Sequence, residues 1–522
     1  MGLAPSCETS TLRQARAAGD DCLRLDRTSI IMTVLTAVLL AAAMAPLFVV
    51  QIPAMVDYVD HLARMGLLAG PPSRAYVVQW RLYPNLAMDL IVPVLAHLMS
   101  VEVATKVFLG ASQVLVVTGA IFIELAVKGR HRLGGMGAML VLFSLPFGWG
   151  QVNFMFGMGL AAWGVGLWIW LRERPALTRW MIHAVVVAAL FVSHFLALGI
   201  YGLTIGLYEL SRFRVWPRLL SLLGLAVFMA SPVLVALVIM SLSGGQIGQP
   251  IFNWNPWVKL AWLPVFMNVY DWPLSLLTAV VLASLVLVSV VLRRVSLSRG
   301  GLWIAAGFAL AYLLLPQGMF ASYEVDIRLL TAAGIMLPAF MNTALGTGVG
   351  RVAPLMMVVG VIVANGARVA SSWFDYQRDY REFKTSFPLL ASGSAVLVGM
   401  TPQALWEYRP LMNAASLAAP SADVFVSCLF SYPGMQPVQP RGAFQSLAVK
   451  EASDYAPQTL PLLTALARNE PGVIAPSSLI GWPRRYQYLY LVGDPGPNPL
   501  PGRLTQIFTG RRFSLFRIRP ET

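Results

Sequence analysis

Residues 28–50 read TSIIMTVLTAVLLAAAMAPLFVV, a stretch without a single charged side chain. A helix needs about 20 apolar residues to cross the hydrocarbon core of a bilayer, so this stretch is long enough to span a membrane. Further apolar blocks follow it as far as Ala370, and only then does the pattern change. The sequence therefore predicts a polytopic α-helical membrane protein with a separate C-terminal part.

The composition of the whole chain agrees with this prediction. Of the 522 residues, 57% are hydrophobic and 12% are charged, whereas an average soluble chain is about a quarter charged. The sequence contains no P-loop, no G-x-G-x-x-G and no G-x-S-x-G motif, and its three cysteines have no metal-ligand spacing. These observations exclude an ordinary soluble enzyme and argue against ATP-driven transport and α/β-hydrolase chemistry.

Hydropathy predicts eleven spans. The apolar segment 84–100 is not among them, because it is short and carries Asp89, Pro93 and His97; we expect it to be a helix on the membrane surface. The expected spans are residues 28–50, 103–127, 133–149, 154–171, 180–198, 199–210, 219–242, 274–292, 302–315, 329–345 and 352–370.

Basic residues set the expected orientation. The leader 1–27 and alternate loops together hold seventeen of them, while the opposite loops hold six. By the positive-inside rule the leader is cytoplasmic, and the large loop 51–102 and the C-terminal segment 371–522 are extracytoplasmic, in the periplasm if this is a cell (inner) membrane. The net charge of +14 then reflects topology, and no nucleic-acid partner is expected.

The C-terminal segment is expected to fold as a small α/β domain. It contains apolar runs of strand length separated by turns rich in proline and glycine. The predicted strands are Ala395–Val398, Val424–Leu429, Tyr486–Val492 and Phe513–Ile518.

The outer loop after the first span contains the densest group of polar residues. Residues 51–64 read QIPAMVDYVDHLAR. If this stretch is helical, Asp57, Asp60, His61 and Arg64 share one face, and a carboxylate there can accept a proton from a hydroxyl group. The structural alternative is a solvated helix in which Asp60 and Arg64 form an ion pair.

This layout resembles the GT-C class of glycosyltransferases, which includes protein O-mannosyltransferases and the lipid A aminoarabinose transferase. The resemblance rests on the acidic pair after the first span, the amphipathic stretch from Tyr83-Pro84-Asn85 to Asp89, the eleven spans and the outer C-terminal domain. In the class the two acids are adjacent or one residue apart, whereas here they are Asp57 and Asp60. Which aspartate acts as the base therefore stays open.

The resemblance implies transfer of a sugar, with inversion, from a polyprenyl-phosphate-linked donor to a hydroxyl group of a glycan, lipid or protein. Either Asp57 or Asp60 would be the catalytic base. Arg328 is the preferred partner of the leaving phosphate and Lys259 the second, with snorkelling to the interface as the structural alternative for Arg328. The need for a divalent cation stays open, and no metal ligand is assigned.

Other residues on the outer side are candidates for binding the substrate or membrane lipid. Structural roles are the alternatives: Asn153 as a helix cap, His194 as a hydrogen-bonded residue between helices, and Asp89 as a residue facing water. The candidates are His61, Arg64, Tyr83, Asn85, Asp89, Asn153 and His194.

Two other functions remain open. One is a transporter or flippase for a lipid-linked glycan, and the other is a non-catalytic membrane scaffold. No Asp, Glu, Lys or Arg lies in the middle of an expected span, which argues against an ion-coupled transporter.

Overall fold

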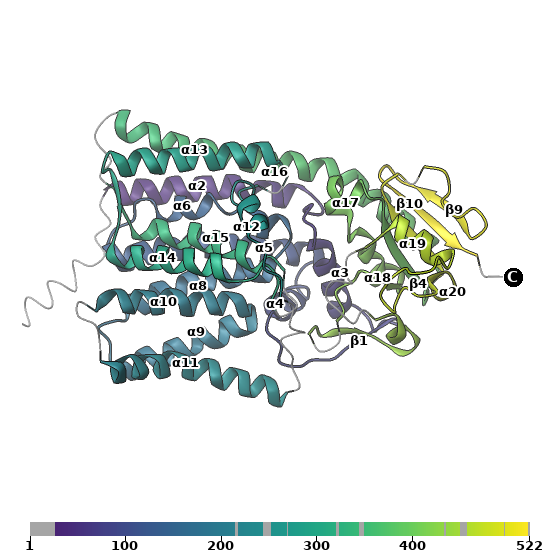
Figure 1. Cartoon of the computed structure of the whole chain (residues 1–522), viewed down its shortest axis with the longest axis horizontal. Helices are drawn as coiled ribbons and strands as arrows, with labels where there is room; N and C mark the ends of the chain where they lie inside the picture. Colours follow the sequence, from purple (N-terminus) through teal and green to yellow (C-terminus); the bar gives the residue numbers. More distant parts are fainter. Residues whose placement is uncertain are drawn as a thin grey trace, which may run out of the picture.

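The protein is a bundle of long helices with a β-sheet at one end, as Figure 1 shows. The computed structural model describes residues 27–213, 218–243, 252–268, 270–319, 323–343, 349–432, 435–448, 457–494 and 496–519. Apart from Arg27, the predicted leader lies outside the described residues.

Seven helices are long and apolar enough to cross a membrane, counted over the described residues. Several of them pack side by side and expose leucine, isoleucine and valine along their outer faces, as expected for surfaces that meet lipid. The chain is thus a multi-pass membrane protein. The seven are α2 (Arg27–Val49), α5 (Val101–Lys128), α8 (Val152–Trp170), α9 (Ala176–Ser193), α11 (Leu219–Leu242), α13 (Trp272–Val291) and α16 (Val349–Ser386).

Four of the expected spans are not among these seven helices. The expected span 133–149 is wrong as a single helix, because it forms α6 (Gly134–Met139) and α7 (Leu145–Gly148) with turns between them. Pro146 in the first turn of α7 cannot continue a preceding helix, since it has no backbone N–H. The expected spans 199–210 and 302–315 correspond to α10 (Phe195–Arg212) and α14 (Arg299–Leu314).

The expected span 329–345 also differs. Helix α15 (Val325–Met336) begins earlier and is followed by the 3-10 turn η2 (Leu337–Phe340), which contains Pro338. The chain then forms the strand β3 (Met341–Thr343), which pairs with β2 (Val295–Leu297). A proline that cannot donate to the preceding turn accounts for the early end of the helix.

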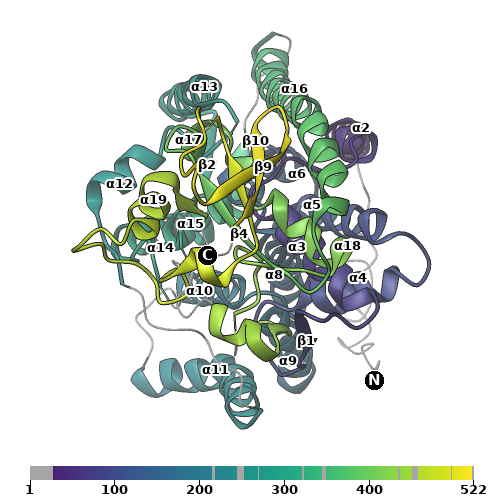
Figure 2. The same ribbon diagram turned by 90° about the vertical axis from the view of Figure 1, so that its right-hand side faces the viewer.

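The outer loop and the C-terminal part meet at the same end of the bundle. The loop contributes α3 (Tyr58–Ala69), β1 (Tyr76–Val78) and α4 (Ala87–Leu95). Helix α4 has nine residues, so the prediction that segment 84–100 does not span is confirmed. Strand β1 pairs antiparallel with β6 (Val438–Pro440), which fastens the loop to the C-terminal part (Figure 2).

The C-terminal part is built on a six-stranded mixed sheet in the order β5-β4-β8-β10-β9, with β7 also paired to β4. All four predicted strands are present, and β7 and β9 are additional. The strands are β4 (Ala395–Met400), β5 (Phe425–Val426), β7 (Gln458–Thr459), β8 (Tyr488–Val492), β9 (Leu504–Thr509) and β10 (Phe513–Ile518).

Helix α16 joins the bundle to this sheet. It continues past the expected boundary at residue 370 and packs Phe383 on Phe513 of β10, with ring centres 3.7 Å apart. Asp379 of α16 is buried and accepts a hydrogen bond from Arg512 at 3.0 Å. Because these contacts are apolar stacking and a buried ion pair, the sheet is held firmly against the end of the bundle.

Candidate active site

Helix α3 begins where the outer loop meets the turn before α8. Asp57 is the N-cap residue of α3, and its backbone N–H donates to the carbonyl oxygen of Trp149 at 2.9 Å. Gly150 lies against this junction with φ of +83°, and a Cβ atom there would come within 2.9 Å of the Asp57 nitrogen. Only glycine accommodates both the backbone conformation and this contact, so the turn fixes the position of Asp57.

A cavity of about 260 Å³ lies beside Asp57. Its walls come from α3, the turn before α8, the junction of α9 and α10, the start of α15 and a segment of the C-terminal part. Seven of the eleven residues predicted from the sequence line it: Asp57, His61, Arg64, Asn85, Asn153, His194 and Arg328.

Two carboxylates, Asp57 and Glu324, and two guanidinium groups, Arg64 and Arg328, line this cavity. Burial raises the pKa of Asp57 to about 8; Glu324 adds to the rise and Arg328 opposes it. Burial also raises the pKa of Glu324 to about 7, against the charge of Arg328. The two acids therefore titrate close to neutral pH, where a carboxylate can both take up and release a proton.

Arg328 offers a cation at the start of α15. It donates from Nη2 to the carbonyl oxygen of Tyr323 at 3.0 Å, and its Nη1 lies 3.2 Å from Nε2 of His194. Its Nε is buried and has no hydrogen-bond partner among the described residues. A buried N–H without an acceptor suits binding of an anion.

His194 connects two helices and also lines the cavity. It lies between α9 and α10, and its Nδ1 accepts a hydrogen bond from the backbone N–H of Leu196 at 3.2 Å. With Nε2 facing Arg328, it fills the predicted structural role of a hydrogen-bonded histidine between helices.

Arg64 is buried and pairs with Asp89 rather than with Asp60. Its Nε and Nη2 donate to the two carboxylate oxygens of Asp89 at 2.7 and 2.9 Å. Its Nη2 also lies 3.2 Å from Nδ1 of His61. The alternative in which Asp60 pairs with Arg64 is therefore wrong, and so is the alternative in which Asp89 faces water, since that residue is 1% exposed.

Asp60 lies on α3 but does not line the cavity. Its side chain is fully buried. Burial raises its pKa well above the ordinary value for an aspartate. Of the two predicted catalytic aspartates, the structure brings only Asp57 to the cavity.

The remaining outer residues position the loop before α4. Asn153 accepts a hydrogen bond from the backbone N–H of Met88 and donates to the carbonyl oxygen of Asn85, both at 2.9 Å. The prediction that Asn153 caps a helix is wrong, because Gln151 is the N-cap residue of α8. Tyr83 is buried outside the cavity walls, whereas Asn85 is exposed at its edge.

Lys259 has a structural role, contrary to the prediction that it binds phosphate. Its Nζ donates to Oδ2 of Asp326 at 2.9 Å and to the carbonyl oxygens of Tyr312 and Leu315 at 2.8 and 2.6 Å. All three N–H groups of the ammonium are thus used, and a carboxylate compensates its charge. Lys259 lines a different, largely apolar cavity of about 590 Å³.

The sequence prediction missed Glu324 and part of the cavity wall. Glu324 accepts a hydrogen bond from Nε2 of Gln151 at 2.9 Å. It precedes Arg328 by four residues, the spacing at which side chains meet on a helix, and this signal was available. The residues from the C-terminal part carried no such signal; they are Phe430, Tyr432, Met435 and Gln436.

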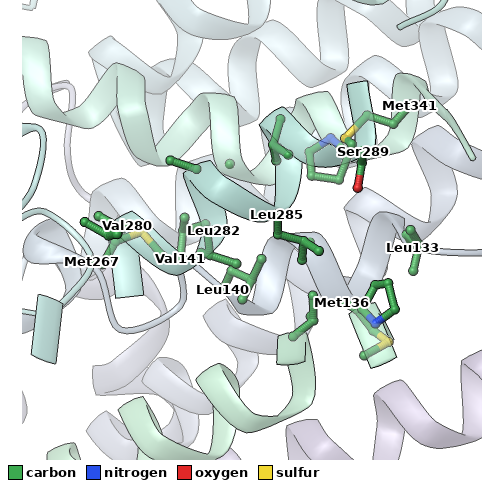
Figure 3. Close-up of a pocket in the computed structure, with 18 of the residues that line it drawn as sticks. Leu133, Met136, Leu140, Val141, Met267, Val280, Leu282, Leu285, Ser289 and Met341 are labelled. Carbon is green, nitrogen blue, oxygen red and sulfur yellow. The ribbon is translucent and has the colours of Figure 1, made fainter. Parts of the chain in front are cut away.

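A second cavity, of about 640 Å³ and larger than the one beside Asp57, has apolar walls (Figure 3). It lies among α6, α13 and α16, and no ionisable side chain lines it. Acid–base chemistry is therefore placed at the smaller, polar cavity beside Asp57. The described residues contain no group of three or more His, Cys, Asp or Glu side chains arranged to hold a metal ion.

No protein-family model and no curated protein sequence matches the chain. The fold is similar to that of ArnT from Cupriavidus metallidurans in the apo state, with 11% identity, a TM-score of 0.48, and 94% of this chain and 99% of that chain covered. The undecaprenyl phosphate-bound structure of the same protein matches with 11% identity, a TM-score of 0.43 and the same coverage. The arabinofuranosyltransferase AftD from Mycobacteria matches with 14% identity, a TM-score of 0.45, and 93% of this chain and 40% of that chain covered. Both proteins are GT-C glycosyltransferases, the class that the sequence resembles.

Proposed function

We propose that the protein is a glycosyltransferase that uses a polyprenyl-phosphate-linked sugar and acts at the end of the membrane bundle that carries the sheet. The observation that carries this proposal is the convergence of Asp57, Glu324 and Arg328 on one cavity. A base and an anion-binding cation within one cavity are the two elements that transfer from a phosphate leaving group requires.

The proposed reaction is a single displacement. Asp57 accepts the proton of the acceptor hydroxyl, and the acceptor oxygen forms a bond with the anomeric carbon of the sugar. The bond between that carbon and the phosphate oxygen breaks, and its electron pair stays on the polyprenyl phosphate. The unused Nε–H and the charge of Arg328 stabilise the oxygen that becomes negative.

Glu324 tunes the base in this scheme. Burial makes the largest contribution to the raised pKa of Asp57, and Glu324 raises it further because two nearby carboxylates cannot both ionise easily. A pKa near the working pH is what Brønsted behaviour favours for a general base. We assign the base to Asp57 rather than Asp60, because Asp60 is outside the cavity wall.

The proposal also includes an orientation of the protein in the membrane. With the leader 1–27 in the cytoplasm, the transmembrane domain 28–370 places the loop 51–102 and the domain 371–522 outside the cell (inner) membrane. The acceptor would then be a glycan, lipid or protein on the outer face. Membrane lipid would surround the helices.

A turnover assay tests the function. Purified protein in liposomes is incubated with a panel of polyprenyl-phosphate sugars and with glycan, lipid and protein acceptors that carry free hydroxyl groups, and release of polyprenyl phosphate is measured. The proposal predicts release with at least one donor, and the same release from Asp494→Asn, which changes an exposed aspartate of the C-terminal part. Movement of intact lipid-linked sugar across the bilayer without bond cleavage would support the flippase alternative instead.

A further inference from the structure

A charge-compensated group next to the base is not used in the proposed displacement. It consists of Asp89, Arg64 and His61, and the last two line the cavity. Asp89 holds the guanidinium of Arg64 by two hydrogen bonds, at 2.7 and 2.9 Å, and both residues are almost fully buried. The ion pair therefore has little freedom to reorient.

The contact between Arg64 and His61 fixes the protonation of the imidazole. Nη2 of Arg64 lies 3.2 Å from Nδ1 of His61. A guanidinium has only N–H donors, so Nδ1 must accept and cannot carry a proton itself. The proton of a neutral imidazole is then on Nε2.

The other ring nitrogen is left for a ligand. None of the described residues accepts a hydrogen bond from Nε2 of His61. The ring is 7% exposed and lines the cavity, where Phe430 of the C-terminal part packs edge-on against it with ring centres 5.8 Å apart. The Nε2–H group is thus held in place and has no acceptor within the described part of the protein.

The chemistry of this donor differs from that of Arg328. Asp89 compensates the charge of Arg64, and burial together with Arg64 lowers the pKa of His61 well below its ordinary value. This corner of the cavity therefore offers donors without net charge. Arg328 has no carboxylate hydrogen-bonded to it among the described residues, and the charges of Glu324 and Asp57 act on it from a longer distance, so its buried Nε–H remains available to an anion.

We infer that Asp89 and Arg64 lock His61 in the Nε2–H form, so that His61 donates a hydrogen bond to an uncharged oxygen of the sugar while Arg328 binds the phosphate. Asp89 and Arg64 are positioning residues in this assignment. The inference rests on the proposed function for the identity of the ligand, but the tautomer of His61 does not depend on it.

Nitrogen-15 spectra of histidine-labelled full-length protein test the tautomer directly. The chain has five histidines, and the signal missing from His61→Gln identifies His61. The inference predicts one Nε2–H tautomer that does not titrate from about pH 5 to 8, the range in which an ordinary histidine changes charge. In Asp89→Asn the signal should become a mixture of tautomers. An Nδ1–H form, or titration near the ordinary pKa, would overturn the inference.

A pair of variants tests the role in binding. The side-chain amide of Gln can replace the Nε2–H donor and that of Asn the Nδ1 position, so His61→Gln should keep the Michaelis constant for the sugar donor within about threefold. His61→Asn should raise it about tenfold. Neither variant should change the affinity for undecaprenyl phosphate, which lacks the sugar. Equal losses in both variants, or weaker binding of undecaprenyl phosphate, would contradict the assignment.

The turnover assay tests the proposed function, and the spectra test the tautomer of His61 independently of that function. If the wild type released no polyprenyl phosphate from any donor, the proposed function would fail. The spectra would still decide whether His61 is locked by Arg64, because they are recorded without substrate.

Discussion

Gln151 donates a hydrogen bond from Nε2 to Oε2 of Glu324 at 2.9 Å, although 173 residues separate them in the sequence. This bond joins the turn before α8 to the start of α15. The same turn also holds Asp57 at the cavity. The hydrogen bond therefore places Glu324 and Asp57 beside one cavity. The acidic pair of the site is therefore Asp57 with Glu324, not Asp57 with Asp60.

The pH dependence of turnover should show this pair. A general base must be unprotonated, and burial raises the pKa of Asp57 to about 8 and that of Glu324 to about 7. The rate should therefore be low in acid and rise with an apparent pKa between these values. A rate that is flat from about pH 5 to 9 would exclude a base with a raised pKa.

Removing the charge of Glu324 should shift this profile. In Glu324→Gln the burial that raises the pKa of Asp57 most remains, but the added repulsion from Glu324 is lost while Arg328 still lowers this pKa. The rising limb should move to lower pH, with part of the maximal rate retained. The measurement is the rate against pH for the variant and the wild type, and an unchanged limb would show that the two acids do not interact.

Gly150→Ala should damage the site more than the fold. Its φ of +83° costs an alanine about 1 kcal/mol, and the added Cβ would also press on the backbone of Asp57 and Tyr58. A displacement of about 1 Å can reduce turnover about 100-fold. Gly472→Ala is the matched control, because that glycine has φ of +79° and nothing within 4 Å of the added Cβ. Equal turnover in the two variants would contradict the role of this turn.

Lys259→Met and Arg328→Met should have different effects. Lys259 is part of a buried ion pair with Asp326, and removal of one partner of such a pair costs about 3–5 kcal/mol. Its variant should therefore lose thermal stability. Arg328→Met should instead lose affinity for undecaprenyl phosphate in a binding assay. If the two variants lost the same property, the assignment of Arg328 to the phosphate would be wrong.

Periodicity and charge predicted the long helices well, because an apolar stretch of about 20 residues has few alternatives in a bilayer. They failed where proline interrupts an apolar run, as Pro146 and Pro338 do. The strands of the C-terminal part were predicted from local alternation, but the pairing of β1 with β6 was not, because it joins segments about 360 residues apart.

The residues of the site were also predicted only in part, because some of their contacts join segments that are far apart in the sequence. Helical spacing grouped Asp57 with His61 and Arg64, which do line one cavity. It also grouped Asp60 with them, but that side chain is buried away from the cavity. Spacing tells which residues share one face of a helix, but not which other segments pack against that face. The partner of Arg64 and the role of Lys259 depend on tertiary contacts, so they could not be predicted from spacing.

The most direct test of the central proposal compares Asp57→Asn with Asp60→Asn in the polyprenyl-phosphate sugar assay. Both changes remove a carboxylate from the same helix or its cap, but only Asp57 lines the cavity. Burial raises the pKa of Asp60 well above its ordinary value and so favours the neutral acid, which Asn resembles in charge and shape. We expect Asp57→Asn to lose turnover by at least about 100-fold while it still binds undecaprenyl phosphate, and Asp60→Asn to retain turnover. Full turnover in Asp57→Asn would contradict its role as the base.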